Sequence, residues 1–106
     1  MTHMPVTQSA AVVLLALGAA AASAQQSDPR SAPYLAANCA NCHGTQGRSA
    51  GAMPSLAGQK QEDLVARMKD FRDGKRAATI MHQLAKGYTD AQIELIAAHF
   101  AKQPAK

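Results

Sequence analysis

Apolar residues recur at helical spacing in the middle of the chain. Between Lys60 and Asp73, the side chains of Leu64, Met68 and Phe71 fall on one face of a helix. Acidic residues occupy the first turn of this segment and a basic residue lies near its end, which suits the helix dipole. Gly74 follows, and glycine is a common residue just after a helix. The pattern predicts a helix over residues 60–73.

A second helix is predicted near the C-terminus. Thr89 is a good N-cap, and Gln92 three residues later completes a capping box. Pro104 follows the end of the segment. One apolar face of this helix is lined by Ile93, Ile96, Ala97 and Phe100.

Two shorter helical segments and one long loop complete the pattern. Pro33 can occupy the first turn of a helix that runs to Cys39. The segment Thr79–Lys86 can form one or two turns ended by Gly87. Residues 44–58 hold four glycines and a proline and are predicted to be a loop. No segment alternates as a strand would, so we predict an all-α fold with three main helices and a short one.

Residues 1–24 have the pattern of a secretory leader. An apolar run from Ala10 to Ala22 is interrupted only by Gly18 and is too short to span a bilayer comfortably. It leads into Ala22-Ser23-Ala24, a small-x-small cleavage pattern. We expect cleavage after Ala24, which leaves one domain of residues 25–106 in the periplasm. An uncleaved anchor is the alternative, because no Lys or Arg precedes the apolar run.

The predicted mature segment has little from which to build a core. A domain this small often depends on a disulfide, a metal or a cofactor. All eleven Lys and Arg and all seven Asp and Glu follow residue 24, so the net charge of +4 belongs to this segment. Nucleic acid is a poor candidate partner, because aromatic residues do not interleave with the basic ones. There is no tryptophan, and the aromatic residues are Tyr34, Phe71, Tyr88 and Phe100.

The candidate chemistry lies in the sequence CANCH. Cys39 and Cys42 are the only cysteines, and His43 follows at once. This spacing is typical of covalent haem attachment, in which each thiol bonds one vinyl group and the histidine ligates the iron. Three alternatives remain open. They are a zinc site with His82 and His99, at an unusual spacing, a redox dithiol, which needs a βαβ context, and a surface disulfide.

A methionine is the expected second axial ligand to a haem iron, and methionine in that position raises the reduction potential. Met68 belongs to an apolar helix face, and Met53 lies only ten residues after His43. Met81 is 38 residues after His43 on a separate segment, so we expect it to reach the opposite face of the haem. His82 is the rival ligand, and otherwise it is a solvated neighbour.

At three motifs the chain resembles a class I cytochrome c of the short bacterial monohaem type. The first motif is CANCH, and the second is MPSLAGQ, which is similar to the family's proline-leucine-glycine loop. The third is TIMHQLAKGYTDAQIELIAAHFAKQ, which is similar to the segment of the distal methionine and the closing helix. This last stretch resembles in particular the cytochrome subunit of flavocytochrome c sulfide dehydrogenases.

The resemblance implies one covalently bound haem c and a set of residues around it. Cys39 and Cys42 would carry the haem, and its iron would lie between His43 and Met81. The carbonyl of Pro54 would accept a hydrogen bond from His43, and Leu56 would pack on the haem.

The family fold also crosses its N- and C-terminal helices beside the haem. In this sequence the resemblance places Tyr34 and Leu35 against Ile96 and Phe100.

One-electron transfer is the function that the resemblance implies, in a protein that is not itself an enzyme. The donor would be a flavoprotein dehydrogenase acting on sulfide or another sulfur compound. A free carrier between another dehydrogenase and a terminal oxidase is the alternative. A peroxidase or gas-binding protein with open iron is a further one, with His82 nearby. Basic residues are expected either to steer an acidic redox partner or to form an ordinary solvated face. They are Lys60, Arg67, Lys69, Arg72, Lys75, Arg76 and Lys86.

Overall fold

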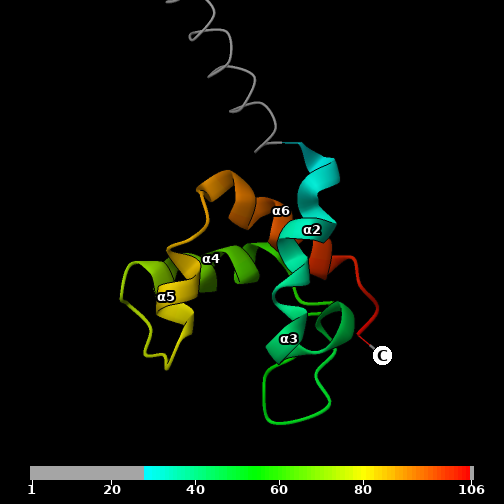
Figure 1. Ribbon diagram of the computed structural model, residues 1–106, viewed down its shortest axis with the longest axis horizontal. Helices are drawn as coiled ribbons and strands as arrows, with labels where there is room; N and C mark the ends of the chain where they lie inside the picture. The colour runs from blue at the N-terminus through cyan, green and yellow to red at the C-terminus, as the bar shows by residue number, and fades with distance from the viewer. Residues whose placement is uncertain (1–27, 106) are drawn as a thin grey trace, which may run out of the picture.

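The structure is a computed structural model, and it describes residues 28–105. The leader predicted at residues 1–24 lies outside the described residues. Within residues 28–105 the fold is all-helical, as predicted, and contains no strand (Figure 1). No helix in this part of the chain is long and apolar enough to cross a membrane. The elements are η1 (Pro29–Ser31), α2 (Ala32–Ala37), α3 (Ala40–His43), η2 (Thr45–Gly47), α4 (Gln61–Arg72), α5 (Met81–Ala85) and α6 (Asp90–Ala101).

The first predicted helix is longer than expected and has a tight turn inside it. It was expected over Pro33–Cys39, but helical backbone angles continue through Asn38 and Cys39 into α3. The amide of Cys39 donates to the carbonyl of Ala36 at 3.0 Å, three residues back, and this separates α2 from α3. The amide of His43 then donates to the carbonyl of Cys39 at 2.9 Å. The cysteines and the histidine therefore lie on one continuous helical path.

Helices α4 and α6 match their predictions closely. α4 ends where Gly74, with a φ of +75°, lets the amide of Lys75 donate to the carbonyl of Asp70 at 2.8 Å. At the start of α6 the predicted capping box is confirmed. The amide of Gln92 donates to Oγ1 of Thr89 at 3.2 Å, and the amide of Thr89 donates to Oε1 of Gln92 at 2.9 Å.

Helix α6 is the centre of the packing. It contacts α2 on one side and α4 on the other, and α5 packs on α4 (Figure 1). The crossing of α2 and α6 does not use Tyr34 as expected, because this side chain is 81% exposed. Leu35 packs against the buried cluster as expected, and the small buried Ala36 belongs to that cluster in addition. The buried cluster consists of Ala36, Leu64, Val65, Ile93, Ile96, Ala97 and Phe100.

A close contact joins the loop after α3 to α6. Gly47 has a φ of +77°, and a Cβ atom there would lie 2.7 Å from Cδ1 of Phe100. The carbonyl of Phe100 accepts a hydrogen bond from the amide of Gly58 at 3.0 Å. Phe100 therefore holds both ends of the loop that carries the candidate site residues.

Replacing Gly47 is expected to destabilise the fold. In Gly47→Ala, the left-handed backbone and the contact with the Phe100 ring together cost about 2 kcal/mol. Urea unfolding of the purified protein measures this change. Gly51→Ala is the matched control, because nothing lies within 4 Å of the Cβ position at Gly51. Equal stability of the two variants would contradict the contact.

An ion pair ties the end of α4 to the start of α6. Nη1 of Arg72 lies 2.6 Å from Oδ1 of Asp90, and Nζ of Lys69 is 4.0 Å from Oδ2 of the same carboxylate. The hydrogen bond from Arg72, helped by the charges of Arg72 and Lys69, lowers the pKa of Asp90 from its ordinary value of 3.8. Folding thus favours the ionised form of Asp90.

This ion pair predicts a pH-dependent effect of Asp90→Asn. Because the pKa of Asp90 is lowered in the folded state, its contribution is full above about pH 3.8 and is lost as the pH falls through the lowered value. We expect Asp90→Asn to lower the melting temperature slightly at pH 7, and the difference to shrink below pH 3.8. Thermal unfolding followed by circular dichroism measures it. Asp63→Asn is the control, since Asp63 lies in the first turn of α4 and makes no salt bridge with any described residue. If the difference in melting temperature between Asp90→Asn and the wild type grew as the pH fell, the lowered pKa of Asp90 would be refuted.

Candidate haem-binding site

His43 is held in one tautomer by the backbone. It is the last residue of α3, and only 7% of it is exposed. Its Nδ1 lies 2.6 Å from the carbonyl oxygen of Pro54. A carbonyl can only accept, so Nδ1 carries the proton and donates it. The Nε2 atom of the neutral ring then keeps a free lone pair, which is the state that a metal ligand needs.

Hydrogen bonds fix the loop that carries the carbonyl of Pro54. The carbonyl of Gly47 accepts from the amides of Leu56 at 2.7 Å and Ala57 at 3.2 Å. The hydroxyl of Ser55 accepts from the amide of Ser49 at 2.9 Å. Pro54 itself is exposed, while Leu56 is half-buried and packs against the core. The loop therefore presents its acceptor to His43 from a braced position.

The two thiols lie one helical turn apart beside His43. The amide of Cys42 donates to the carbonyl of Cys39 at 3.3 Å. Both cysteines are free; Cys39 is half-buried against the core, and Cys42 is exposed. Burial raises the pKa of the Cys39 thiol, so this thiol stays protonated at neutral pH. One thiol thus faces the interior and the other faces outward.

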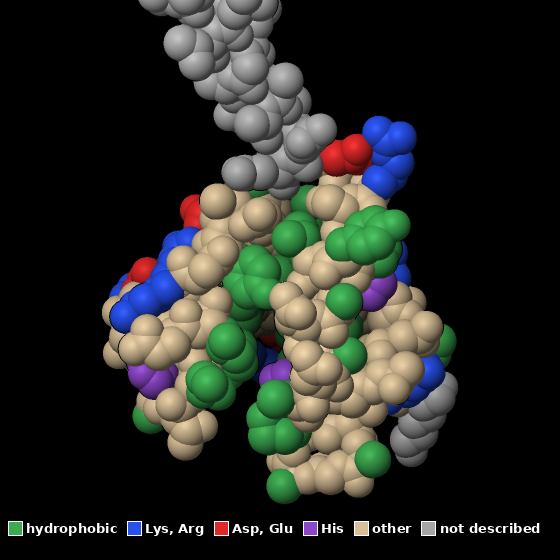
Figure 2. Space-filling model, in the orientation of Figure 1, with side chains coloured by type: hydrophobic (Ala, Val, Ile, Leu, Met, Phe, Trp, Pro, Cys, Tyr) green, Lys and Arg blue, Asp and Glu red, His purple; other side chains and the backbone are tan. Residues whose placement is uncertain are grey.

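A hollow with apolar walls lies between the two lobes of the molecule. Figure 2 shows hydrophobic side chains on both of its sides, one side formed by α4 and α5 and the other by α3 and the loop after it. Met81 is the first residue of α5 and is half-buried. His43 on α3 and Met81 on α5 therefore belong to the elements on opposite sides of this hollow.

These residues fit a covalently attached haem better than the alternatives. The tautomer of His43, the paired free thiols and the apolar hollow are what this group requires. A zinc site is not assembled, because within residues 28–105 no three His, Cys, Asp or Glu side chains converge. The cysteines are not joined as a disulfide.

Comparison with known proteins supports the same reading. The chain matches the cytochrome c family over residues 31–103. The chain belongs to this family. Membership implies a covalently bound c-type haem, and Cys39 and Cys42 fit its attachment motif.

Relatives of this cytochrome c include subunits and acceptors of sulfur-oxidising enzymes. It is 44% identical over 66 residues to the cytochrome subunit of sulfide dehydrogenase from Chlorobaculum tepidum, covering 62% of this chain and 60% of that one. It is 36% identical over 73 residues to a thiosulfate dehydrogenase electron acceptor from Thiomonas intermedia, covering 67% and 34%. The solved structure of cytochrome c4 from Acidithiobacillus ferrooxidans matches with a TM-score of 0.57 and 40% identity, covering 59% and 37%. The chain therefore spans less than two thirds of the length of these relatives.

The other methionines and His82 differ in how far they are buried. Met68 packs against the core as predicted, and Met53 is 42% exposed. His82 was expected to be a solvated neighbour of Met81, but it is half-buried. Its Nδ1 is buried and makes no hydrogen bond with any described residue. His82 lies on α5, which packs on α4.

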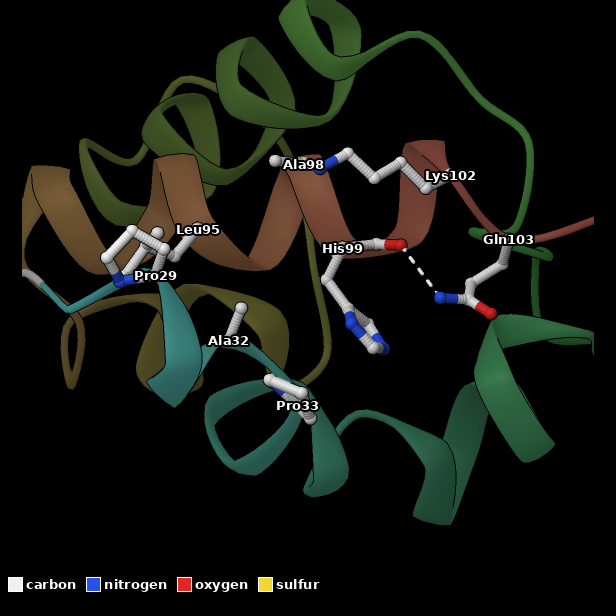
Figure 3. A pocket seen from close by; sticks show the side chains of 8 residues that line it. All are labelled: Pro29, Ala32, Pro33, Leu95, Ala98, His99, Lys102 and Gln103. Carbon is white, nitrogen blue, oxygen red and sulfur yellow. Dashed lines mark hydrogen bonds between the residues drawn. The ribbon is translucent and has the colours of Figure 1, made fainter.

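A shallow pocket elsewhere on the molecule is not part of the haem site. Its volume is about 300 Å³, and it lies where η1 and α2 meet α6 (Figure 3). His99 lines it, and the carbonyl of His99 accepts from Nε2 of Gln103 at 3.1 Å. None of the residues predicted to bind haem lines this pocket.

Sequence reasoning missed two residues that brace the loop of Pro54. Nε2 of Gln59 donates to the carbonyl of Ser55, and Nη1 of Arg67 donates to Oε1 of Gln59. Arg67 was counted with the basic residues that would steer a partner, but it is half-buried and engaged. Arg67 lies three residues after Leu64, which is buried. Residues at this spacing share a helix face, so the stem of Arg67 could have been expected to be partly buried.

Proposed function

We propose that this chain is a one-electron carrier that uses a single covalently attached haem c, with His43 and Met81 as the axial ligands. The observation that carries the proposal is the hydrogen bond from Nδ1 of His43 to the carbonyl of Pro54, 2.6 Å long. In the neutral imidazole this bond leaves the lone pair on Nε2, and His43 lies on the helical path that carries the two free cysteines. Haem supplies the reversible change between ferrous and ferric iron.

The residues around the haem have separate tasks in this proposal. Cys39 and Cys42 hold the group covalently, and His43 and Met81 fill both axial positions so that no substrate binds. Leu56 and the core behind it keep water from one side. Since little moves between the two oxidation states, the residues serve to keep the site rigid and not to carry out catalysis. The chain would therefore be an electron-transfer protein and not an enzyme.

The physiological setting is the second part of the proposal. Residues 1–24 act as a cleaved leader and residues 25–106 form the cytochrome domain in the periplasm. The donor is a flavoprotein dehydrogenase that oxidises sulfide or another sulfur compound, with this chain as its electron-accepting subunit. The similarity to a sulfide dehydrogenase subunit and to a thiosulfate dehydrogenase electron acceptor supports this choice. A free carrier to a terminal oxidase is the alternative.

Ligation by Met81 predicts a spectral change in Met81→Ala. The chain expressed with its leader, in a host able to attach haem, should show the sharp reduced bands of c-type haem. Oxidised, it should show the weak long-wavelength band of methionine-ligated ferric haem. Met81→Ala should lose that band and have a lower reduction potential, because a thioether favours ferrous iron. Absorption spectra and a redox titration measure both.

Met53→Ala is the matched control for this experiment, since Met53 is exposed. It should keep the band and the potential. If the wild-type protein binds haem but lacks this band, the second ligand is His82 or the position is open. An open position would favour the peroxidase or gas-binding alternative. Absence of haem from the purified chain would refute the whole proposal.

Charge on the loop between α4 and α5 is the feature that fits an acidic partner. Lys69 and Arg72 are paired with Asp90, and Arg67 is engaged with Gln59. Lys75 and Arg76 are exposed on this loop, with the guanidinium of Arg76 lying 5.6 Å from the ring centre of Phe71. These two cations adjoin the lobe that carries Met81.

Reversing these charges should slow electron uptake from an acidic dehydrogenase. Lys75→Glu combined with Arg76→Glu is expected to reduce the second-order rate at low salt by about tenfold or more, and the loss should fade at high salt. Stopped-flow reduction by the sulfide-oxidising flavoprotein measures this. Lys102→Glu, in the segment after α6, serves as the control. Equal rates for both variants would place the docking surface elsewhere.

A further inference from the structure

A chain of side-chain hydrogen bonds runs from helix α4 to the loop beside His43. Arg67 donates through Nη1 to Oε1 of Gln59, and Gln59 donates through Nε2 to the carbonyl of Ser55. Both ends fix the orientation of the Gln59 amide, because a guanidinium can only donate and a carbonyl can only accept. All three residues are half-buried. The amide therefore joins a charged donor on a helix to the residue after Pro54.

Ser55 is held at two points by this arrangement. Its carbonyl accepts from Gln59, and its hydroxyl accepts from the amide of Ser49 at 2.9 Å. The ring of Pro54 fixes the φ angle of Pro54 itself. The carbonyl of Pro54 is thus attached to a residue that cannot shift without breaking hydrogen bonds. Its distance of 2.6 Å to Nδ1 of His43 depends on that attachment.

The charge of Arg67 adds to the mechanical effect. A hydrogen bond from a charged donor polarises the amide that accepts it, and the N–H of that amide then donates more strongly. The clamp on Ser55 is consequently stronger with Arg67 present than with Gln59 alone.

We propose that Arg67 and Gln59 form a positioning relay that sets the strength of the hydrogen bond from His43 to the carbonyl of Pro54, and with it the basicity of Nε2. This rests on the proposed role of His43 as an axial ligand. A firm hydrogen bond at Nδ1 makes Nε2 a better electron donor, which favours ferric over ferrous iron. Loss of the relay should weaken that bond and raise the reduction potential.

The test uses the haem-loaded protein and follows the Nδ1 proton of His43 by NMR in the reduced state. Gln59→Met keeps the length of the side chain and removes both hydrogen bonds. We expect the exchange of this proton with water to become about fivefold faster, the effect of losing one hydrogen bond. Arg67→Met should give a smaller acceleration, because the hydrogen bond from Gln59 to the carbonyl of Ser55 remains. The double variant should be no faster than Gln59→Met, because Arg67 acts through Gln59.

Two further measurements separate the relay from general loosening of the fold. Backbone amides of α6 serve as an internal reference, since global destabilisation would accelerate their exchange as well. The potential of Gln59→Met should rise, while that of Gln61→Met should not change. Gln61 is the matched control because its exposed side chain contacts only Glu94 on α6 among the described residues, at 3.3 Å. If Gln59→Met does not fold, Gln59→Glu keeps the contact with Arg67, lacks the donor to Ser55, and should give the same acceleration.

The outcomes distinguish the relay from the proposed function. A wild-type protein that shows the Nδ1 proton signal of a ligating His43 satisfies the proposed function. An exchange rate unchanged in Gln59→Met, or multiplied in the double variant, overturns the relay and leaves haem ligation standing. A smaller acceleration in Arg67→Met than in Gln59→Met, with no further gain in the double variant, supports it.

Discussion

One face of helix α6 organises the described part of the protein. Ile93 and Phe100 are fully buried, and α6 contacts both α2 and α4. The core contains few large side chains, and a domain of this size buries little surface. The loop that carries the candidate site is therefore held by the same residues that form the core. The ring of Phe100 presses on Gly47, and its carbonyl binds the amide of Gly58. The loop between these glycines is therefore placed by the same helix that closes the core.

That loop positions the hydrogen-bond acceptor of His43. His43 ends a helical path that packs on α6, and the carbonyl that orients it lies on the loop that α6 also holds. A change in one part is thus transmitted to the other through short contacts. The relay of Arg67 and Gln59 extends this bracing to α4, so all the long elements of the fold contribute to the environment of one imidazole. Such over-determination suits an electron carrier, because a rigid site has little to reorganise when its charge changes.

The surface divides the basic residues into two groups. Arg72, Lys69 and Arg67 have partners within the molecule and stabilise the junctions between helices or the loop. The exposed residues Lys60, Lys75, Arg76 and Lys86 form no salt bridge with any described residue and remain available to another protein. A count of basic residues alone overstates the positive charge that can attract a partner, because some of these residues are paired within the molecule.

The main helices and the motif of the candidate site could be predicted from the sequence alone. The capping box of Thr89, the stop after α4 and the CANCH motif are local signals, because each depends on residues within one or two turns. Pro54 was indicated by resemblance, and its hydrogen bond to His43 is present in the structure. Three features follow from the folded arrangement and not from local signals: Tyr34 is exposed, Nδ1 of His82 is buried, and Arg67 is hydrogen-bonded to Gln59. These features depend on contacts between elements that are far apart in the sequence. Helical periodicity predicts on which face of a helix a side chain lies, but it does not predict which element packs against that face.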